Sequence, residues 1–307
     1  MNKTQLGYLL LLLTLVAAPF VGAYPILVIK LLCFALFASA FNLLLGFTGL
    51  LSFGHAAFFG GAAYAAGHAM KHWGLTPELG LLFGALAGGA LGFLFGLLAI
   101  RRQGIYFAMI TLALAQMVFF YCLQAAFTHG EDGIQAVPRG KLLGLVDLSQ
   151  PLAMYALVLV VFVAGFGLLY RAVHSPFGQV LKAIRENEPR AISLGYDTDR
   201  YKLLAFVLSA ALSGLAGATK ALVFQLASLT DVYWTMSGEV VLMTLVGGMG
   251  TIFGPVVGAA VIVTMENYLA QLGSWVTVVQ GAVFVVCVLT FRRGIVGELG
   301  ARLKKSL

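Results

Sequence analysis

Long apolar runs separated by short polar segments make up most of this chain. A helix rises about 1.5 Å per residue, so about 20 mostly apolar residues cross the roughly 30 Å hydrocarbon core of a bilayer. This count predicts nine spans, two of them short, at 6–23, 25–46, 56–70, 79–100, 105–127, 151–170, 203–226, 255–272 and 275–291. A shorter apolar piece, 238–250, ends in a glycine cluster and is expected to be a half-helix or re-entrant segment. We therefore expect an all-α fold, a polytopic transmembrane helical bundle of roughly 8–10 spans with broken or re-entrant segments.

The composition argues against an ordinary soluble protein. Of the 307 residues, 61% are hydrophobic and 10% are charged, whereas soluble domains carry about 25% charged residues. The formal net charge is +7, but the basic residues lie between apolar runs, which is typical of membrane topology rather than of nucleic-acid binding. Cys33, Cys122 and Cys287 lie inside apolar runs without Cys-x-x-Cys spacing. We therefore expect no disulfide framework, no metal site and no bound cofactor.

Basic residues predict how the spans are oriented, because lysine and arginine concentrate in cytoplasmic loops. If the N-terminus is cytoplasmic and every run, including 238–250, crosses once, then fourteen of the nineteen basic residues face the cytoplasm. The loop 128–150 then faces the periplasm, and both termini of one membrane-spanning domain, 1–307, are cytoplasmic. The fourteen residues are Lys3, Arg101, Arg102, Arg171, Lys182, Arg185, Arg190, Arg200, Lys202, Arg292, Arg293, Arg302, Lys304 and Lys305.

The first apolar run has a second interpretation. Residues 1–23 begin with a basic residue and end in small residues, which is also the pattern of a cleaved secretory signal peptide. Another long apolar run follows at once, so a helical hairpin is the simpler interpretation.

Glycine is placed regularly in one predicted span. It recurs every four residues, at Gly80, Gly84, Gly88, Gly92 and Gly96. Residues four apart share a helix face, and the missing side chains let another backbone approach closely. We therefore expect this face to pack against a neighbouring helix.

Two short segments resemble one another. Residues 49–54 and 250–254 share glycine at both ends and phenylalanine before the second glycine, and a further glycine follows each. Interrupted helices are tolerated only where the freed backbone groups face protein or water. The pair suggests an internal repeat whose broken helices line the interior.

The hydrophilic segment 171–202 is the most informative part of the chain. Its first half repeats apolar residues at the spacing of one helix face and carries charge on the other. Pro189 suits the first turn of a second short helix, and Gly195 suits its C-terminal cap. We expect a helix–elbow–helix docking element on the cytoplasmic face, rather than a plain surface loop. The apolar positions are Phe177, Val180, Leu181 and Ile184.

Four motifs stand out in and around this segment: Ser175-Pro176-Phe177-Gly178, Lys182 to Ala191, Leu194-Gly195-Tyr196 and Gly247-Gly248-Met249-Gly250-Thr251. In these motifs the chain resembles branched-chain amino acid ABC transporter permeases of the LivM type. Ser52-Phe53-Gly54-His55 and Tyr106-Phe107-Ala108-Met109 match as well, so the resemblance extends over about residues 35 to 295.

The resemblance implies a permease subunit in the bacterial inner membrane. In this family a permease, usually paired with a sister type, binds two cytoplasmic ATPase subunits, and a periplasmic binding protein delivers the solute. The chain would hydrolyse nothing itself, and it contains no Gly-x-x-x-x-Gly-Lys-Ser/Thr phosphate loop. The segment 171–202 would be the coupling loop. Its expected ATPase contacts are Arg185, Glu186, Asn187 and Arg190, with Ala191, Leu194 and Gly195 shaping the fitted surface.

Polar groups inside spans are candidates for function, because charge at membrane depth is costly. Lys30 and Lys220 lie near outer span ends and are expected to extend to the interface. Glu239 lies near the start of the half-helix and is expected to complement the positive helix terminus. The residues expected to line a weakly binding translocation route are Asn42, Thr111 and Glu266.

Two other function classes fit less well. An ion-coupled secondary transporter could use Lys30, Glu239 and Glu266, but it needs no dedicated coupling loop. An intramembrane enzyme needs a reactive site, and the chain has neither a His-Glu-x-x-His run nor a Gly-x-Ser-x-Gly motif.

The substrate is left open by the sequence. Leucine, isoleucine and valine are what the resemblance implies by default, whereas related permeases serve urea, amides or aromatic acids. The outer segment 128–134 departs from the glycine-richer form associated with the commonest members, which weakens the default.

Overall fold

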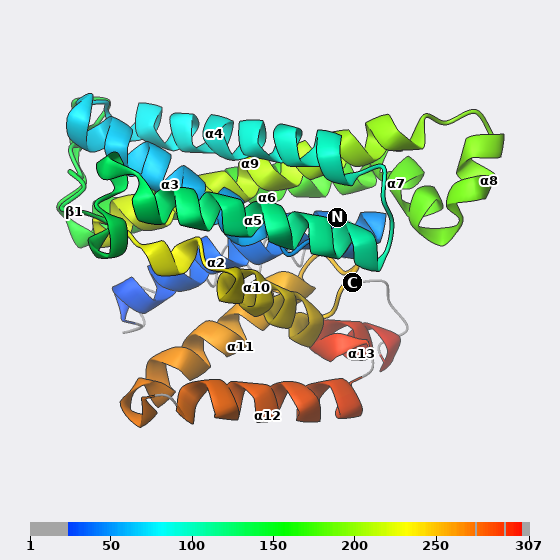
Figure 1. The fold of residues 1–307 in the computed structure, drawn as a ribbon. Helices are drawn as coiled ribbons and strands as arrows, with labels where there is room; N and C mark the ends of the chain where they lie inside the picture. The colour runs from blue at the N-terminus through cyan, green and yellow to red at the C-terminus, as the bar shows by residue number, and fades with distance from the viewer. Residues whose placement is uncertain (1–23, 274, 292, 303–307) are drawn as a thin grey trace.

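The computed structural model describes residues 24–273, 275–291 and 293–302, and this part of the chain is almost entirely helical (Figure 1). The first predicted span, 6–23, lies outside the described residues. The helix α2 continues from residue 43 to 48 as a π-helix. The helices are α2 (Pro25–Asn42), α3 (His55–His72), α4 (Pro77–Ala99), α5 (Ile105–Gln124), α6 (Pro151–His174), α7 (Pro176–Glu186), α8 (Glu188–Ser193), α9 (Thr198–Phe224), α10 (Trp234–Gly247), α11 (Gly254–Leu269), α12 (Trp275–Thr290) and α13 (Gly294–Arg302).

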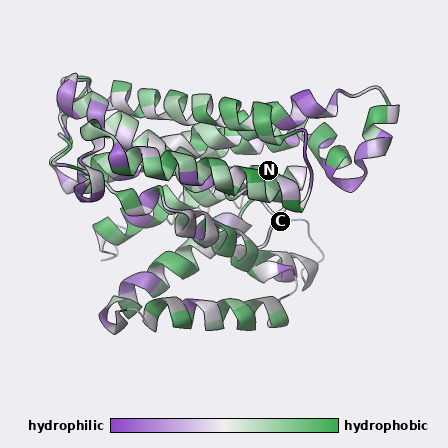
Figure 2. Ribbon diagram, viewed as in Figure 1, coloured by the Kyte–Doolittle hydropathy of each residue, from purple (hydrophilic) through white to green (hydrophobic). Residues whose placement is uncertain are grey.

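Among the described helices, five are long and apolar enough to cross a membrane, namely α2 with its π-helical extension, α4, α5, α6 and α9. The helices α11 and α12 are apolar but span only 16 residues each. Figure 2 shows hydrophobic residues along the helices and hydrophilic ones gathered mainly at their ends. The prediction of a polytopic helical membrane protein is confirmed.

The helix α4 has the polarity expected of a helix between lipid and protein. Its large apolar side chains point outward: Leu82, Leu86, Leu94 and Leu98 are all more than half exposed. Its repeated glycines are buried: Gly80 faces Met70 of α3, and Gly84, Gly88, Gly92 and Gly96 face α9. At Gly88, an added Cβ would lie 2.7 Å from the carbonyl oxygen of Ala210 and 2.8 Å from the Cα of Gly214. The predicted close packing of the glycine face is therefore confirmed.

The two hydrophilic segments lie at opposite ends of the bundle (Figure 1). At one end, α7 and α8 project beyond α4 and α9. At the other end lies the loop between α5 and α6, where β1 (Ile134–Gln135) pairs antiparallel with β4 (Leu226–Ala227). In the same loop, β2 (Lys141–Leu142) pairs with β3 (Val146–Asp147). The predicted topology places 171–202 and 128–150 on opposite sides of the membrane, and the side that each end faces stays a prediction.

Candidate functional site

The segment 171–202 folds as the predicted helix–elbow–helix. The apolar face of α7 is turned inward, with Val180, Leu181 and Ile184 buried. Asn187 forms the elbow and caps α8, because its Oδ1 accepts a hydrogen bond from the backbone N–H of Arg190 at 3.0 Å. Gly195 follows α8 with a φ of +89°, the left-handed conformation in which glycine commonly ends a helix.

Glu188 fastens α8 to the rest of the protein. Its carboxylate pairs with Lys202 of α9, whose side chain is only 2% exposed. The same carboxylate accepts hydrogen bonds from Thr198 Oγ1 at 3.2 Å and from Gln103 Nε2 at 2.8 Å. Sequence spacing does not indicate this pair, since Glu188 begins α8 and Lys202 lies in the second turn of α9.

The residues expected to contact an ATPase are exposed, with one exception. Ala191 is buried in a small cluster with Val180 and Ile184, so it shapes the surface from below. The tip of α8 also carries apolar side chains that the sequence did not single out: Ile192 is 55% exposed and Tyr196 is 41% exposed, beside Leu194 at 68%. The exposed residues are Arg185, Glu186, Asn187, Arg190, Leu194 and Gly195. The ATPase contacts themselves stay a prediction.

The elbow, by which we mean α7 and α8 together, contacts a place where two helices are interrupted. The contact is made by α7. The first interruption is the π-helix and the loop that follows it, and the second is the turn between α10 and α11. The backbone of Gly250 lies beside Gly46, where an added Cβ would be 2.6 Å from the Gly250 nitrogen. The two segments that resemble one another in sequence therefore belong to neighbouring breaks, which we call the paired breaks.

Two side chains hold the paired breaks together. Asn42 accepts a hydrogen bond from the backbone N–H of Gly250 at 3.0 Å and donates one to the carbonyl of Thr251 at 2.8 Å. Arg185 of α7 donates to the carbonyl of Gly46 and lies close to Gly250. Arg185 therefore links α7 directly to the backbone of the first break and places its guanidinium beside the second.

Replacing Asn42 with alanine is expected to loosen the paired breaks. Two hydrogen bonds to backbone would be lost, each contributing about 1 kcal/mol, so we expect a lower thermal midpoint for the purified protein. Ser39→Ala is the matched control, because the buried Ser39 Oγ, one turn earlier on α2, makes no hydrogen bond to the described residues. Equal midpoints for the two variants would contradict this role for Asn42.

The three residues expected to line a route lie in different surroundings. Thr111 is buried and, like Asn42, supports a break: it accepts from the backbone N–H of Phe53 at 3.1 Å and donates to the carbonyl of Ala108 at 3.0 Å. Glu266 pairs with Lys30, twelve residues before Asn42 on α2 and so roughly 18 Å away along the helix. The route stays a prediction. Asn42 lines a small pocket of about 20 Å³, whereas Glu266 lines a much larger open cavity.

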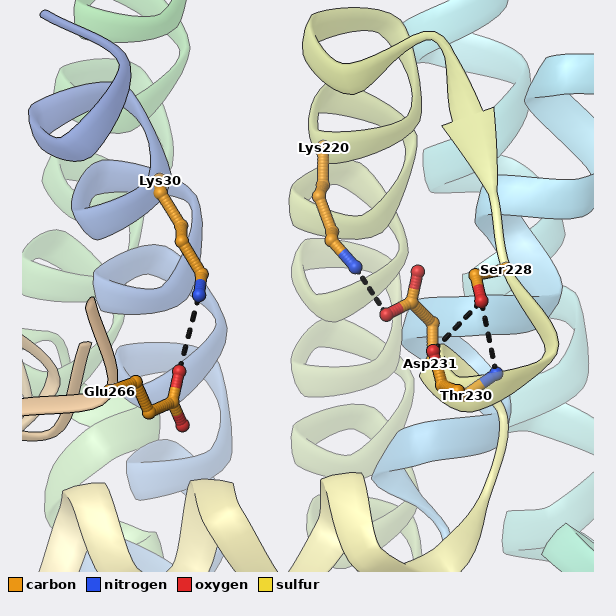
Figure 3. Close-up of polar contacts among 6 residues, drawn as sticks. All are labelled: Lys30, Lys220, Ser228, Thr230, Asp231 and Glu266. Carbon is orange, nitrogen blue, oxygen red and sulfur yellow. Dashed lines mark hydrogen bonds and ion pairs between the residues drawn. The ribbon is translucent and has the colours of Figure 1, made fainter. Parts of the chain in front are cut away.

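That cavity, which we call the outer cavity, lies among α2, α9, α10 and α11 and measures about 460 Å³. The charged residues that line it differ from three expectations drawn from the sequence. Lys30 does not simply extend to the interface, because its Nζ lies 3.2 Å from Glu266 Oε2 (Figure 3). Lys220 likewise pairs with Asp231. Glu239 is the sixth residue of α10, beyond the first turn, so it does not cap the helix.

Comparison with known proteins gives one consistent result. A family model described as "Branched-chain amino acid transport system / permease component" matches residues 24–288. The high-affinity branched-chain amino acid transport permeases LivM of Salmonella typhimurium and Escherichia coli are each 26% identical over 98% of this chain and 77% of their own length. The ribose import permease RbsC of Bacillus subtilis is 31% identical over 59% of this chain and 58% of its own. No solved structure matches significantly.

Proposed function

Because this chain belongs to the family of permease components of branched-chain amino acid transport systems, we propose that it translocates leucine, isoleucine and valine across the bacterial inner membrane. The family consists of transport subunits of ATP-binding cassette importers, which work with ATPase subunits and a solute-binding protein. The feature that best supports this role is the elbow of α7 and α8, which projects from one end of the bundle and presents an apolar tip.

The proposed partners follow from the two ends of the molecule. Two cytoplasmic ATPase subunits would drive the importer, one of them docking on the elbow, and a sister permease would form the other half of the membrane domain. A periplasmic binding protein would deliver the solute at the end that carries the loop 128–150. Both termini would then be cytoplasmic. Covalent labelling of a cysteine at Leu194 only after cell permeabilisation would support this orientation, and labelling in intact cells would overturn it.

The contacts around the elbow suggest how ATP binding becomes movement. Closure of the ATPase pair would push on the exposed surface of α8. The Glu188–Lys202 pair would carry that push into α9, and Arg185 would carry it to the paired breaks. Backbone at a break has few helical hydrogen bonds to lose, so it moves at lower cost than a continuous helix. The chain supplies the moving parts, and ATP hydrolysis takes place on the partner subunits.

The substrate is the finer part of the proposal. Similarity to LivM extends over 98% of this chain, whereas similarity to the ribose permease covers 59%, so a branched-chain amino acid is favoured over a sugar. Urea, amides and aromatic acids are the alternatives within the same importer class. An ion-coupled secondary transporter would take up solute without ATPase subunits, so uptake that persists with an inactive ATPase would overturn the importer.

Leu194→Asp is expected to abolish stable association with the ATPase and to reduce ATP-dependent leucine uptake to background. Leu194 is 68% exposed, so the substitution leaves the fold intact but places an unpaired charge in an apolar contact. The measurement is co-purification of tagged permease and ATPase, together with uptake of labelled leucine. Leu145→Asp is the matched control for association with the ATPase, since Leu145 is 87% exposed at the opposite end. Normal association and uptake in the Leu194→Asp variant would contradict the docking surface.

A further inference from the structure

The outer cavity gathers five ionisable side chains from five segments of the chain. Lys30 comes from α2, Lys220 from α9, Asp231 from the 3₁₀ turn Leu229–Asp231, Glu239 from α10 and Glu266 from α11. Stability does not explain such a collection, because buried ion pairs can often be replaced by apolar residues of similar volume without loss. Ionisable residues at membrane depth instead mark paths for polar solutes.

Four of the five ionisable side chains in the outer cavity form ion pairs, and the fifth does not. Lys30 pairs with Glu266, which also accepts a hydrogen bond from Gln280 at 3.1 Å. Lys220 pairs with Asp231, whose Oδ2 is buried without a hydrogen-bond partner among the described residues. The carboxylate of Glu239 makes no hydrogen bond or ion pair with any described residue, although all four other charges lie near enough to act on it electrostatically. Two lysines thus face three carboxyl groups in the cavity, and Glu239 is the carboxyl group without a partner of its own among the described residues.

Both lysines have N–H donors that their carboxylate partners do not use. An ammonium group has three N–H donors, and in each lysine only one of them is used on the carboxylate partner (Figure 3). Each ammonium also lies over an aromatic ring, Lys30 at 5.7 Å from the centre of Phe34 and Lys220 at 5.8 Å from that of Phe59. These contacts hold the two positive charges at fixed points of the wall.

We propose that the outer cavity is a transient binding site for a zwitterionic amino acid, with the solute ammonium on Glu239 and the solute carboxylate on Lys30 or Lys220. The apolar part of the wall, formed by Phe34, Phe224 and Met236, receives the aliphatic side chain. The volume of about 460 Å³ lies within the range of roughly 300–1,000 Å³ common for small-molecule sites. A sugar or urea carries no charge, so it would form an ion pair with neither Glu239 nor the lysines. The inference rests on the proposed importer function and adds the residues that would select its solute.

The position in the fold agrees with an entry site. Lys30 lies near the start of α2 and Lys220 near the end of α9, whereas the elbow adjoins the opposite ends of both helices. A solute in the outer cavity is therefore separated from the paired breaks by most of the length of α2. It would bind at the periplasmic end and move inward only after the breaks rearrange.

The uptake test uses the complete importer with labelled L-leucine. Glu239→Gln keeps the size and removes the charge, and it is expected to lower uptake at least tenfold while assembly with the ATPase is unchanged. Glu239→Asp, which keeps a carboxylate at the same position, is expected to retain most of the uptake. Normal uptake in the Glu239→Gln variant would overturn the site. Absence of ATP-dependent uptake in the unsubstituted importer would instead overturn the proposed function, and the second measurement then decides the site.

The second measurement needs no transport. Thr235→Cys places a thiol on the exposed rim of the outer cavity, where its reaction with a small cationic thiol reagent is timed in the assembled complex. The chain without this cysteine gives the background. Millimolar L-leucine is expected to slow the reaction at least threefold, while ribose and urea have no effect, and adding Glu239→Gln should abolish the protection. Equal protection by ribose, or none by L-leucine, would overturn a zwitterion site.

Discussion

Glu188→Ala is expected to undock α8 and uncouple ATP hydrolysis from transport. The substitution leaves Lys202 buried without its partner, and removing one member of a buried ion pair costs about 3–5 kcal/mol. The side chains of Lys202 and Glu188 are 2% and 16% exposed, so solvent screens their interaction little. Because about 1.4 kcal/mol is a factor of ten, hydrogen exchange of the α8 amides should rise by roughly 100-fold or more. Leucine uptake should fall in parallel.

Two further variants separate the charge pair from a general effect of mutation. Arg200→Ala breaks the exposed pair between Arg200 and Asp197, whose side chains are 83% and 50% exposed, so it should cost less than about 1 kcal/mol. Glu188→Ala combined with Lys202→Met leaves no buried charge and should restore most of the protection of α8. Similar exchange in the Glu188→Ala and Arg200→Ala variants would rule out a special role for the buried pair.

Gly88→Leu is expected to destabilise the bundle more than any comparable change on the lipid-facing side. Even a Cβ at Gly88 would lie 2.7 Å from a carbonyl oxygen and 2.8 Å from a Cα of α9, so the two backbones must separate. Overpacking of this kind typically costs about 1–3 kcal/mol, and occasionally more. A leucine adds three further carbons, so its cost should reach or exceed the upper end of that range. The measurement is the thermal midpoint and the yield of monodisperse protein in detergent.

Gly167→Leu is the matched control for Gly88→Leu. Gly167 also lies within a long apolar helix, but it is exposed and an added Cβ would meet nothing within 4 Å. Leucine there adds apolar surface that faces lipid and has a better helix propensity than glycine. Its thermal midpoint should equal or exceed that of the unsubstituted chain. A similar fall in both variants would mean that the cost arises from losing any glycine, and not from the α4–α9 contact.

The helix α2 links the elements that these predictions address. It runs from Pro25 to Asn42: Lys30, near its start, lies beside the outer cavity, and Asn42, at its end, binds the paired breaks. It packs against α6, α9, α10 and α11. A change in the paired breaks can therefore shift one wall of the outer cavity as a rigid element. This is a physical connection between the elbow and the place where we propose that solute binds.

Several features follow from local sequence. The spacing of Val180, Leu181 and Ile184 predicts a helix with one buried face, and the structure confirms it. The glycine repeat on α4 predicts close packing because its spacing alone places the small residues on one face. The position of Gly195 predicts the end of a helix, since glycine readily adopts a left-handed conformation. In each case the feature is determined by residues that are close together in the sequence.

The sequence by itself determined the membrane class, the positions of most helices and the elbow, because hydrophobic spacing and helix caps are local properties. Only the tertiary structure decided the partners of the charged residues. Lys30 and Glu266 are separated by 236 positions, and Asn42 and Gly250 by 208. No local pattern encodes such contacts, since they exist only after α2 has packed against α10 and α11. The same packing turns Lys30 and Lys220, which by position alone would extend to the interface, into the charged wall of a cavity.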